Sequence, residues 1–372
     1  MDVVWPQSAS TVGVSMSFVT DGRSTSSVDP RLLRHRRVPR YPSLRDSEPV
    51  IRTWLTDTFD LAHPLVGAPM AGPGEGALAA AVSAAGGLGM IGVNASRSAD
   101  WVHEQAATAA ASGAPYGVGL MAWVLDRDDA QLRAVLDVRP PLVSVSFGTF
   151  EPYVDRLHDA GVRVAVQAGN LAEARRAADA GADVVVARGA EGGGHGRNEV
   201  GTLPLLQGVL DAVDVPVLAA GGIATARGLA AVLAAGAAGA WIGTALLSTV
   251  EAGTPPAARE RLLAADDTAT AYGRVFDVAQ RLDWPEEFGG RALRNAYFDR
   301  WHDRLDDLAS DDDAAAELAE GQSSGDLETA YVYAGQGAGL LREERSVAEV
   351  LDEMTTGAEA LLRNGLDKLG QP

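Results

Sequence analysis

The chain of 372 residues contains no cysteine and a single lysine, Lys368. Without cysteine it has no disulfide, no thiolate metal ligand and no cysteine nucleophile. The six histidines show no paired spacing of the kind found in zinc enzymes, so we predict that the protein binds no metal. No apolar run is both long enough and free enough of charged and turn residues to span a bilayer. We therefore expect a soluble, cytoplasmic protein without a membrane partner.

Positive charge is scarce, because 31 basic residues stand against 50 acidic ones and give a formal net charge of -19. Such a chain repels nucleic-acid backbones, and its body lacks a basic patch, so we expect no nucleic-acid partner. Acidic residues outnumber basic ones, and nearly all the basic residues are arginine. Both features fit either a protein from a high-salt cytoplasm or a GC-rich coding bias, and we do not choose between these explanations. The oligomeric state is open too, and a homo-oligomer is compatible with the sequence.

The first fifty residues differ in composition from the rest of the chain. They are rich in small polar residues and then basic, without the apolar core of a secretory signal. We interpret residues 1–50 as a flexible N-terminal extension, part of which reflects a misplaced start if Met16 is the true first residue. A mitochondrial-type presequence is disfavoured, because Asp2, Asp21 and Asp29 dilute its positive charge.

From about Pro64 short apolar runs alternate with alanine-rich segments of helical period. The predicted strands are residues 65–69, 88–93, 116–120, 142–146, 163–167, 183–187, 215–219 and 240–243. The predicted helices between them include residues 76–85, 99–111, 152–160, 171–180 and 226–235. Eight such units favour an α/β fold of the (β/α)₈ TIM barrel type. A doubly wound sheet is the rival, but the segment after the first strand, APMAGPGEG, lacks its G-x-G-x-x-G spacing.

The regular pattern stops after Gly243. Residues 255–324 are charged and helical in composition, and they contain most of the aromatic residues of the second half of the chain. We predict a helical cap here, its aromatics mostly packing among themselves and one or two of them facing the barrel mouth. Residues 51–254 and 325–372 are assigned to the barrel, with a last helix at about 346–369.

The segment DVVVARGAEGGGHGR, residues 183–197, carries the strongest functional signal. A buried strand ends there in a loop with five glycines and one histidine, His195. Glycines let such a loop approach a ligand closely, and a histidine is a ready acid or base near neutral pH. A tight connection with a solvated histidine is the alternative interpretation.

A second signal lies at AAGGIATARG, residues 219–228, and WIGTALL, residues 241–247. These segments follow the seventh and eighth predicted strands, whose loops often bind a phosphate in barrels. Gly221, Gly222 and Gly243 leave backbone amides uncovered, and Thr244 adds a hydroxyl. Each loop alone is also compatible with an ordinary connection.

These segments belong to a longer series. The chain from about residue 64 to residue 365 resembles the nitronate monooxygenase family, formerly called 2-nitropropane dioxygenases, which are FMN-dependent barrel enzymes. The matching segments are APMAG at 68–72, AAGGLGMIG at 84–92, VSFG at 145–148, GAEGGGHG at 189–196, GTLPLL at 201–206, AAGGIA at 219–224, IGT at 242–244 and YAGQGAG at 333–339. Flavin-dependent enoyl-acyl-carrier-protein reductases look similar over much the same stretch.

The resemblance implies roles for residues along this series and next to it. FMN is expected at the strand ends, and His195 is expected beside the substrate as the catalytic residue. The residues expected to bind FMN are Ala68, Pro69, Met70, Arg188, Gly194, Gly221, Gly222, Gly243, Thr244, Gln336 and Gly337. Met70, Met121 and Trp123 are expected either to restrict water at the site or simply to pack at the barrel rim.

The chain also departs from the family pattern. Gly119 stands where family members commonly carry an asparagine, Arg188 where a glutamine precedes the histidine loop, and Ala245 where arginine is frequent. Arg188 is expected either to bring positive charge near the flavin or an anionic substrate, or to face outward at the surface.

The resemblance implies that FMN and O₂ oxidise alkyl nitronates, or nitroalkanes after deprotonation, to a carbonyl compound and nitrite. One alternative is an NAD(P)H-dependent reductase of an enoyl thioester or another activated alkene. The other is a flavin-binding assembly component without catalysis.

Overall fold

The computed structural model describes residues 51–369, and the extension predicted for residues 1–50 lies outside the described residues. Within that range eight parallel strands close into a barrel in chain order, which confirms the predicted TIM barrel. The strands are β1 (Leu65–Met70), β2 (Leu88–Gly92), β3 (Tyr116–Met121), β4 (Leu142–Ser146), β5 (Arg163–Ala168), β6 (Val184–Arg188), β8 (Val217–Ala220) and β9 (Gly239–Ile242).

The strands were predictable because both of their faces are buried. In β6, Val184 and Val186 point into the barrel interior, whereas Val185 and Ala187 pack against the surrounding helices. A strand covered on both sides appears in the sequence as an unbroken apolar run. The barrel closes where β1 pairs in parallel with β9, through Val66 and Trp241 among others.

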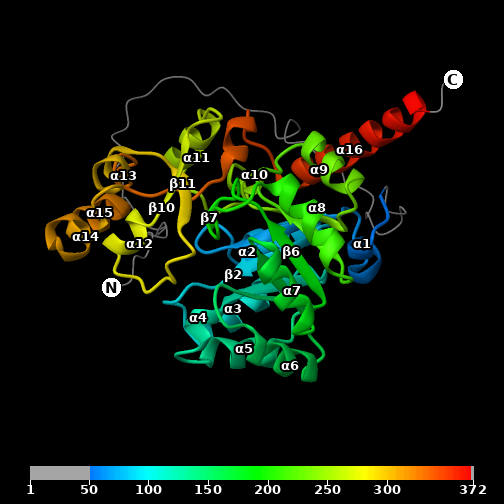
Figure 1. The fold of residues 1–372 in the computed structure, drawn as a ribbon, viewed down its shortest axis with the longest axis horizontal. Helices are drawn as coiled ribbons and strands as arrows, with labels where there is room; N and C mark the ends of the chain where they lie inside the picture. The colour runs from blue at the N-terminus through cyan, green and yellow to red at the C-terminus, as the bar shows by residue number, and fades with distance from the viewer. Residues whose placement is uncertain (1–50, 370–372) are drawn as a thin grey trace, which may run out of the picture.

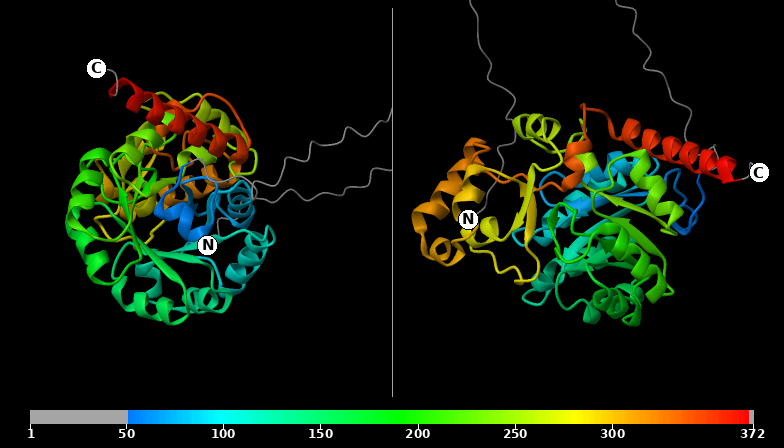
Figure 2. Two further views of the ribbon diagram at one scale, coloured as in Figure 1. Left: turned by 90° about the vertical axis from the view of Figure 1, so that its right-hand side faces the viewer. Right: turned by 45° about the horizontal axis from the view of Figure 1, so that its top comes forward.

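Helices surround the strands as a ring (Figure 2). They are α2 (Gly76–Ala84), α3 (Ala99–Ala110), α5 (Ala130–Val138), α6 (Glu151–Asp159), α7 (Leu171–Asp179), α8 (Thr202–Ala212) and α9 (Ala226–Ala234), with the short α4 (Ala122–Leu125) and α10 (Thr244–Leu247) at strand ends. Gly161, Gly181 and Gly236 follow α6, α7 and α9 with φ of 77°, 88° and 107°. They end these helices in the left-handed conformation that the sequence predicted.

Two further helices complete the barrel. The first, α1 (Trp54–Phe59), brings Leu55 and Phe59 to the apolar cluster inside the barrel. The last, α16 (Val347–Leu369), packs across α9 and α2. No helix among residues 51–369 has the length and apolar character that a bilayer crossing requires.

The cap lies beside the barrel, drawn in yellow and orange in Figure 1. Its helices are α11 (Pro256–Leu263), α12 (Val275–Ala279), α13 (Ala296–Trp301), α14 (Leu305–Ser310) and α15 (Asp312–Ser324), and η3 (Gln336–Leu340) follows it. The cap also contains two strands that we did not predict, β10 (Thr270–Gly273) and β11 (Gly290–Leu293). They form a three-stranded antiparallel sheet with β7 (Gly194–His195), the histidine loop itself. The cap is therefore joined to the loop by backbone hydrogen bonds.

Most cap aromatics pack among themselves, as predicted. Phe276, Tyr297, Phe298 and Trp301 form the core of the cap. Trp284 instead lines the cavity at the barrel mouth.

Candidate active site

A cavity of about 450 Å³ lies at the carboxyl ends of the barrel strands, and residues of the barrel and of the cap line it together. It gathers the loops of both functional signals that the sequence contained, although these loops are far apart in the chain. The predicted site residues that line it are Ala68, Pro69, Met70, Arg188, Gly194, His195, Gly221, Gly222, Gly243, Thr244 and Gly337.

Gln336 is a correction to the predicted set. Its side chain is exposed and does not line the cavity. Its backbone N–H donates to the carbonyl oxygen of Glu191 at 2.9 Å, and η3 begins at this residue. The chain thus turns so that Gly337, and not Gln336, meets the cavity.

One end of the cavity is a backbone cradle formed by the loops after β8 and β9. Gly221 and Gly222 have φ of 104° and 71°, a region that favours glycine. A Cβ on Gly221 would lie 2.8 Å from Thr202 Oγ1, so only glycine fits there. Gly243 lines the same end with Thr244. Thr244 Oγ1 accepts a hydrogen bond from Gly335 N–H at 2.9 Å, and within residues 51–369 this hydroxyl donates to no other group.

His195 lies in the wall of the cavity. Its backbone pairs with Gly290 of β11, and its ring stacks on Trp284 with 3.7 Å between centroids and 1° between planes. Tyr272 of β10 donates its hydroxyl hydrogen to Gly196 O at 3.0 Å. The cap therefore fixes both the loop and the imidazole.

Asp277 is a site residue that we did not predict. Its Oδ1 lies 2.8 Å from His195 Nε2, and the residue is only 1% exposed. The Tyr333 hydroxyl donates to the same oxygen at 3.4 Å. Burial and the nearby Asp277 raise the pKa of Tyr333 well above its usual value, so this hydroxyl stays protonated. No sequence pattern pointed to Asp277, since 82 residues separate it from His195.

Arg188 is buried beneath the histidine loop, so the surface position considered for it is wrong. Its guanidinium donates to the carbonyl oxygens of Gly192, Gly193 and Gly194 at 2.8–3.1 Å and of Arg197 at 3.2 Å. Burial lowers the pKa of Arg188 to about 10, so the group remains charged at neutral pH. It shapes the loop and places positive charge at the cavity floor.

We predict that Arg188→Lys lowers the free energy of unfolding by about 3 kcal/mol, because an ammonium lacks the planar fork that reaches four carbonyls. Urea unfolding measures this loss. Arg363→Lys, at an exposed position on α16, is the control and is expected to change stability by less than about 0.5 kcal/mol. Equal stability of the Arg188 variant and the parent would show that the guanidinium contacts are not needed.

The crowding around Gly119 explains why glycine stands here in place of the asparagine common in the family. A Cβ at this position would lie 2.4 Å from Pro69 Cβ and 3.1 Å from Ser144 Oγ. The Pro69 ring cannot rotate to another rotamer, so it cannot relieve this contact by moving aside. The asparagine common at this position in the family does not fit this barrel.

We therefore predict that Gly119→Asn destabilises the protein by about 2–3 kcal/mol and weakens flavin binding, because it overpacks the strand end against Pro69. Thermal unfolding and flavin content after purification measure both effects. A Gly119→Asn variant that is as stable as the parent and binds flavin more tightly would contradict this explanation.

The lining of the cavity is unusual for so acidic a chain. None of the lining residues within the described chain is aspartate or glutamate, and the charged side chains among them are Arg97 and Arg188, with His195 titratable. An anion therefore meets no lining carboxylate at this mouth.

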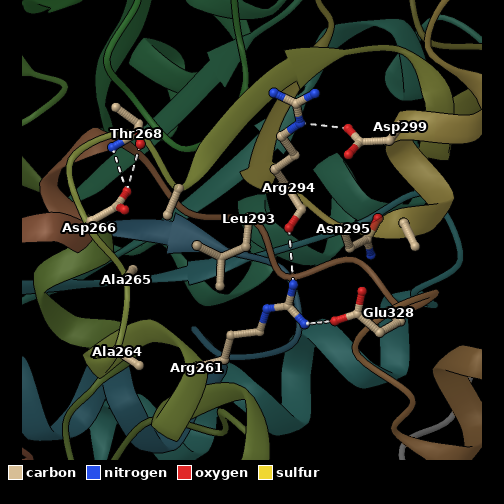
Figure 3. A pocket seen from close by; sticks show the side chains of 12 residues that line it. Arg261, Ala264, Ala265, Asp266, Thr268, Leu293, Arg294, Asn295, Asp299 and Glu328 are labelled. Carbon is tan, nitrogen blue, oxygen red and sulfur yellow. Dashed lines mark hydrogen bonds and ion pairs between the residues drawn. The ribbon is translucent and has the colours of Figure 1, made fainter.

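A second hollow of about 530 Å³ lies on the cap (Figure 3). Its arginines are paired, Arg261 with Glu328 and Arg294 with Asp299. It contains none of the predicted site residues, so the barrel mouth remains the candidate active site.

Comparison with known proteins supports the resemblance. The family model for nitronate monooxygenase matches residues 118–357. A putative monooxygenase of Mycobacterium tuberculosis is 39% identical over 232 residues, which cover 59% of this chain and 58% of the relative's length. The chain thus spans less than two thirds of that relative.

Two solved structures are similar over most of the chain. FabK from Thermotoga maritima has a TM-score of 0.74 at 29% identity and covers 86% of this chain and 98% of its own. Nitroalkane oxidase from Streptomyces ansochromogenes has a TM-score of 0.72 at 32% identity and covers 84% of this chain and 99% of its own. With the family model matching more than half of its residues, the chain belongs to the nitronate monooxygenase family of oxidoreductases.

Proposed function

We propose that the protein is an FMN-dependent enzyme that uses O₂ to oxidise alkyl nitronates, or nitroalkanes after deprotonation, to a carbonyl compound and nitrite. The observation that carries the proposal is the cavity itself. It combines the glycine cradle, His195 and a lining without carboxylates in a chain of net charge -19. FMN phosphate and nitronate are both anions, so this lining suits both.

The residues present fit FMN. The uncovered amides around Gly222 and Gly243, with the hydroxyl of Thr244, would hold the phosphate, and no lysine is needed. Pro69 and Met70 would lie against the isoalloxazine. Bound FMN supplies the electron-transfer chemistry, while the protein supplies placement and electrostatics.

His195 acts on the substrate. As neutral imidazole it accepts the α-proton of a nitroalkane, and as imidazolium it holds the nitronate oxygens. The charge of Arg188 at the cavity floor stabilises negative charge in the site. Trp123 and Trp284, whose rings lie 5.3 Å apart, restrict water on the side of His195.

The test is an anaerobic titration of FMN-loaded protein with a small nitronate, followed by admission of O₂ and assay for nitrite. We expect the flavin spectrum to change on nitronate addition and nitrite to be released in the presence of O₂. Absence of both would contradict the proposal.

Reduction of an enoyl thioester by NAD(P)H is the second candidate, supported by the likeness to flavin-dependent enoyl-acyl-carrier-protein reductases. Anaerobic mixing with NADH and with NADPH separates the two functions. Rapid bleaching of the flavin by either nicotinamide would favour the reductase, and no bleaching favours the nitronate enzyme. A yellow protein that responds to neither nitronate nor nicotinamide would point to a flavin binder without catalysis.

A further inference from the structure

We infer that Asp277 is a positioning residue for His195. It keeps a proton on Nε2, so that Nδ1 is the atom that accepts the substrate proton. The inference rests on the proposed function for the identity of the substrate, but the arrangement of the two side chains is a property of this chain alone.

The first step concerns the buried carboxylate. Asp277 is 1% exposed, and no arginine or lysine pairs with it within residues 51–369. A buried carboxylate is costly unless donors satisfy it. The donors that reach Oδ1 are His195 Nε2, at 2.8 Å, and the Tyr333 hydroxyl, at 3.4 Å. Because Asp277 only accepts when ionised, Nε2 carries a hydrogen.

The second step concerns the orientation of the ring. Trp284 stacks on the imidazole at 3.7 Å, and the Tyr333 ring centroid lies 5.1 Å away at 55°. The backbone of His195 is held by its pairing with Gly290. The ring contacts with Trp284, Tyr333 and Asp277 restrict rotation of the imidazole, and the backbone pairing fixes the loop that carries it.

The third step identifies the free nitrogen. Nδ1 of His195 makes no hydrogen bond to any residue of the described chain, and the ring lines the cavity. Nδ1 is thus the ring nitrogen left for a substrate. When it takes the α-proton, the electrons of the C–H bond form the C=N bond of the nitronate. The resulting imidazolium is stabilised by the carboxylate behind it.

The cap therefore contributes to the chemistry, and not only to enclosure. Asp277 lies on α12, and Trp284 lies in the segment between α12 and β11. The barrel provides the histidine loop, and the cap provides the group that sets its tautomer.

The test compares the parent protein with Asp277→Asn. An asparagine amide can donate to Nε2 and so moves the ring hydrogen to Nδ1, which removes the base. We expect kcat for a neutral nitroalkane to fall about 100-fold or more, and kcat for the preformed nitronate, which needs no deprotonation, to fall less than about tenfold. Asp283→Asn is the control, because Asp283 is exposed just after α12 and, among residues 51–369, forms an ion pair with Arg127 alone.

Nitrogen NMR of histidine-labelled protein provides a readout independent of turnover. At a pH where His195 is neutral, we expect its hydrogen on Nε2 in the parent and on Nδ1 in Asp277→Asn. A parent spectrum with the hydrogen on Nδ1 would overturn the inference, as would an equal loss of both activities in a flavin-loaded variant. If the variant does not fold, the parent spectrum alone decides. If the parent oxidises neither substrate, the proposed function fails while the NMR result still tests Asp277.

Discussion

Replacing His195 with asparagine is expected to lower turnover of a neutral nitroalkane about 1,000-fold, within the range known for loss of a general base. Asparagine keeps hydrogen-bonding atoms in the loop but is not a base near neutral pH. The fold of the loop is expected to persist, since Arg188 and β11 hold its backbone. Flavin content is expected to stay unchanged.

His103→Asn is the matched control for this variant. His103 is half-buried on α3, where its Nε2 lies 3.4 Å from Asp137 Oδ2, and it is not among the residues that line the cavity. Its substitution is expected to leave turnover unchanged. Turnover in His195→Asn within threefold of the parent, with a full complement of flavin, would show that His195 is not the base.

Gly222→Asp is expected to weaken FMN binding by about 100- to 1,000-fold. The new carboxylate would bring negative charge to the cradle proposed for the phosphate, and two unit charges about 4 Å apart repel by about 4 kcal/mol at an effective dielectric constant of about 20. Aspartate tolerates the positive φ of 71° at this position better than most residues. A Cβ at this position would lie 3.3 Å from Glu191 Cβ, so bulk contributes to the loss as well as charge.

Gly222→Asn separates charge from bulk. Asparagine has the same shape and the same tolerance of positive φ, so it is expected to weaken FMN binding only about tenfold. Quenching of FMN fluorescence on titration with flavin-free protein gives each Kd. Equal dissociation constants for the aspartate and asparagine variants would indicate that the phosphate does not lie at Gly222.

The barrel was predictable from the sequence because its strands are buried on both faces and several of its helices are followed by glycine. The apolar run at Val184–Ala187 and the glycine at Gly181 are local features, and each specifies its own structure. The cradle was predictable for a related reason. Loops that follow neighbouring barrel strands meet at one mouth, whatever their distance along the chain.

The cap strands were not predictable in the same way. β10 and β11 have four residues each, and their pairing with Gly194 and His195 depends on contacts between distant segments. Asp277 was missed for the same reason. It reaches His195 only because β11 and α12 pack against the histidine loop, and that packing is a contact between distant segments. Gln336 was misplaced because a matching sequence segment does not specify which of two adjacent residues faces inward.

The central claim is that the histidine and the glycine cradle serve one bound flavin. A crystal structure of the purified protein with FMN tests this claim most directly. We predict the phosphate at the amides around Gly222 and Gly243, the isoalloxazine against Pro69 and Met70, and His195 facing the substrate side of the ring. A flavin bound elsewhere, or a protein that takes up no flavin, would contradict the account.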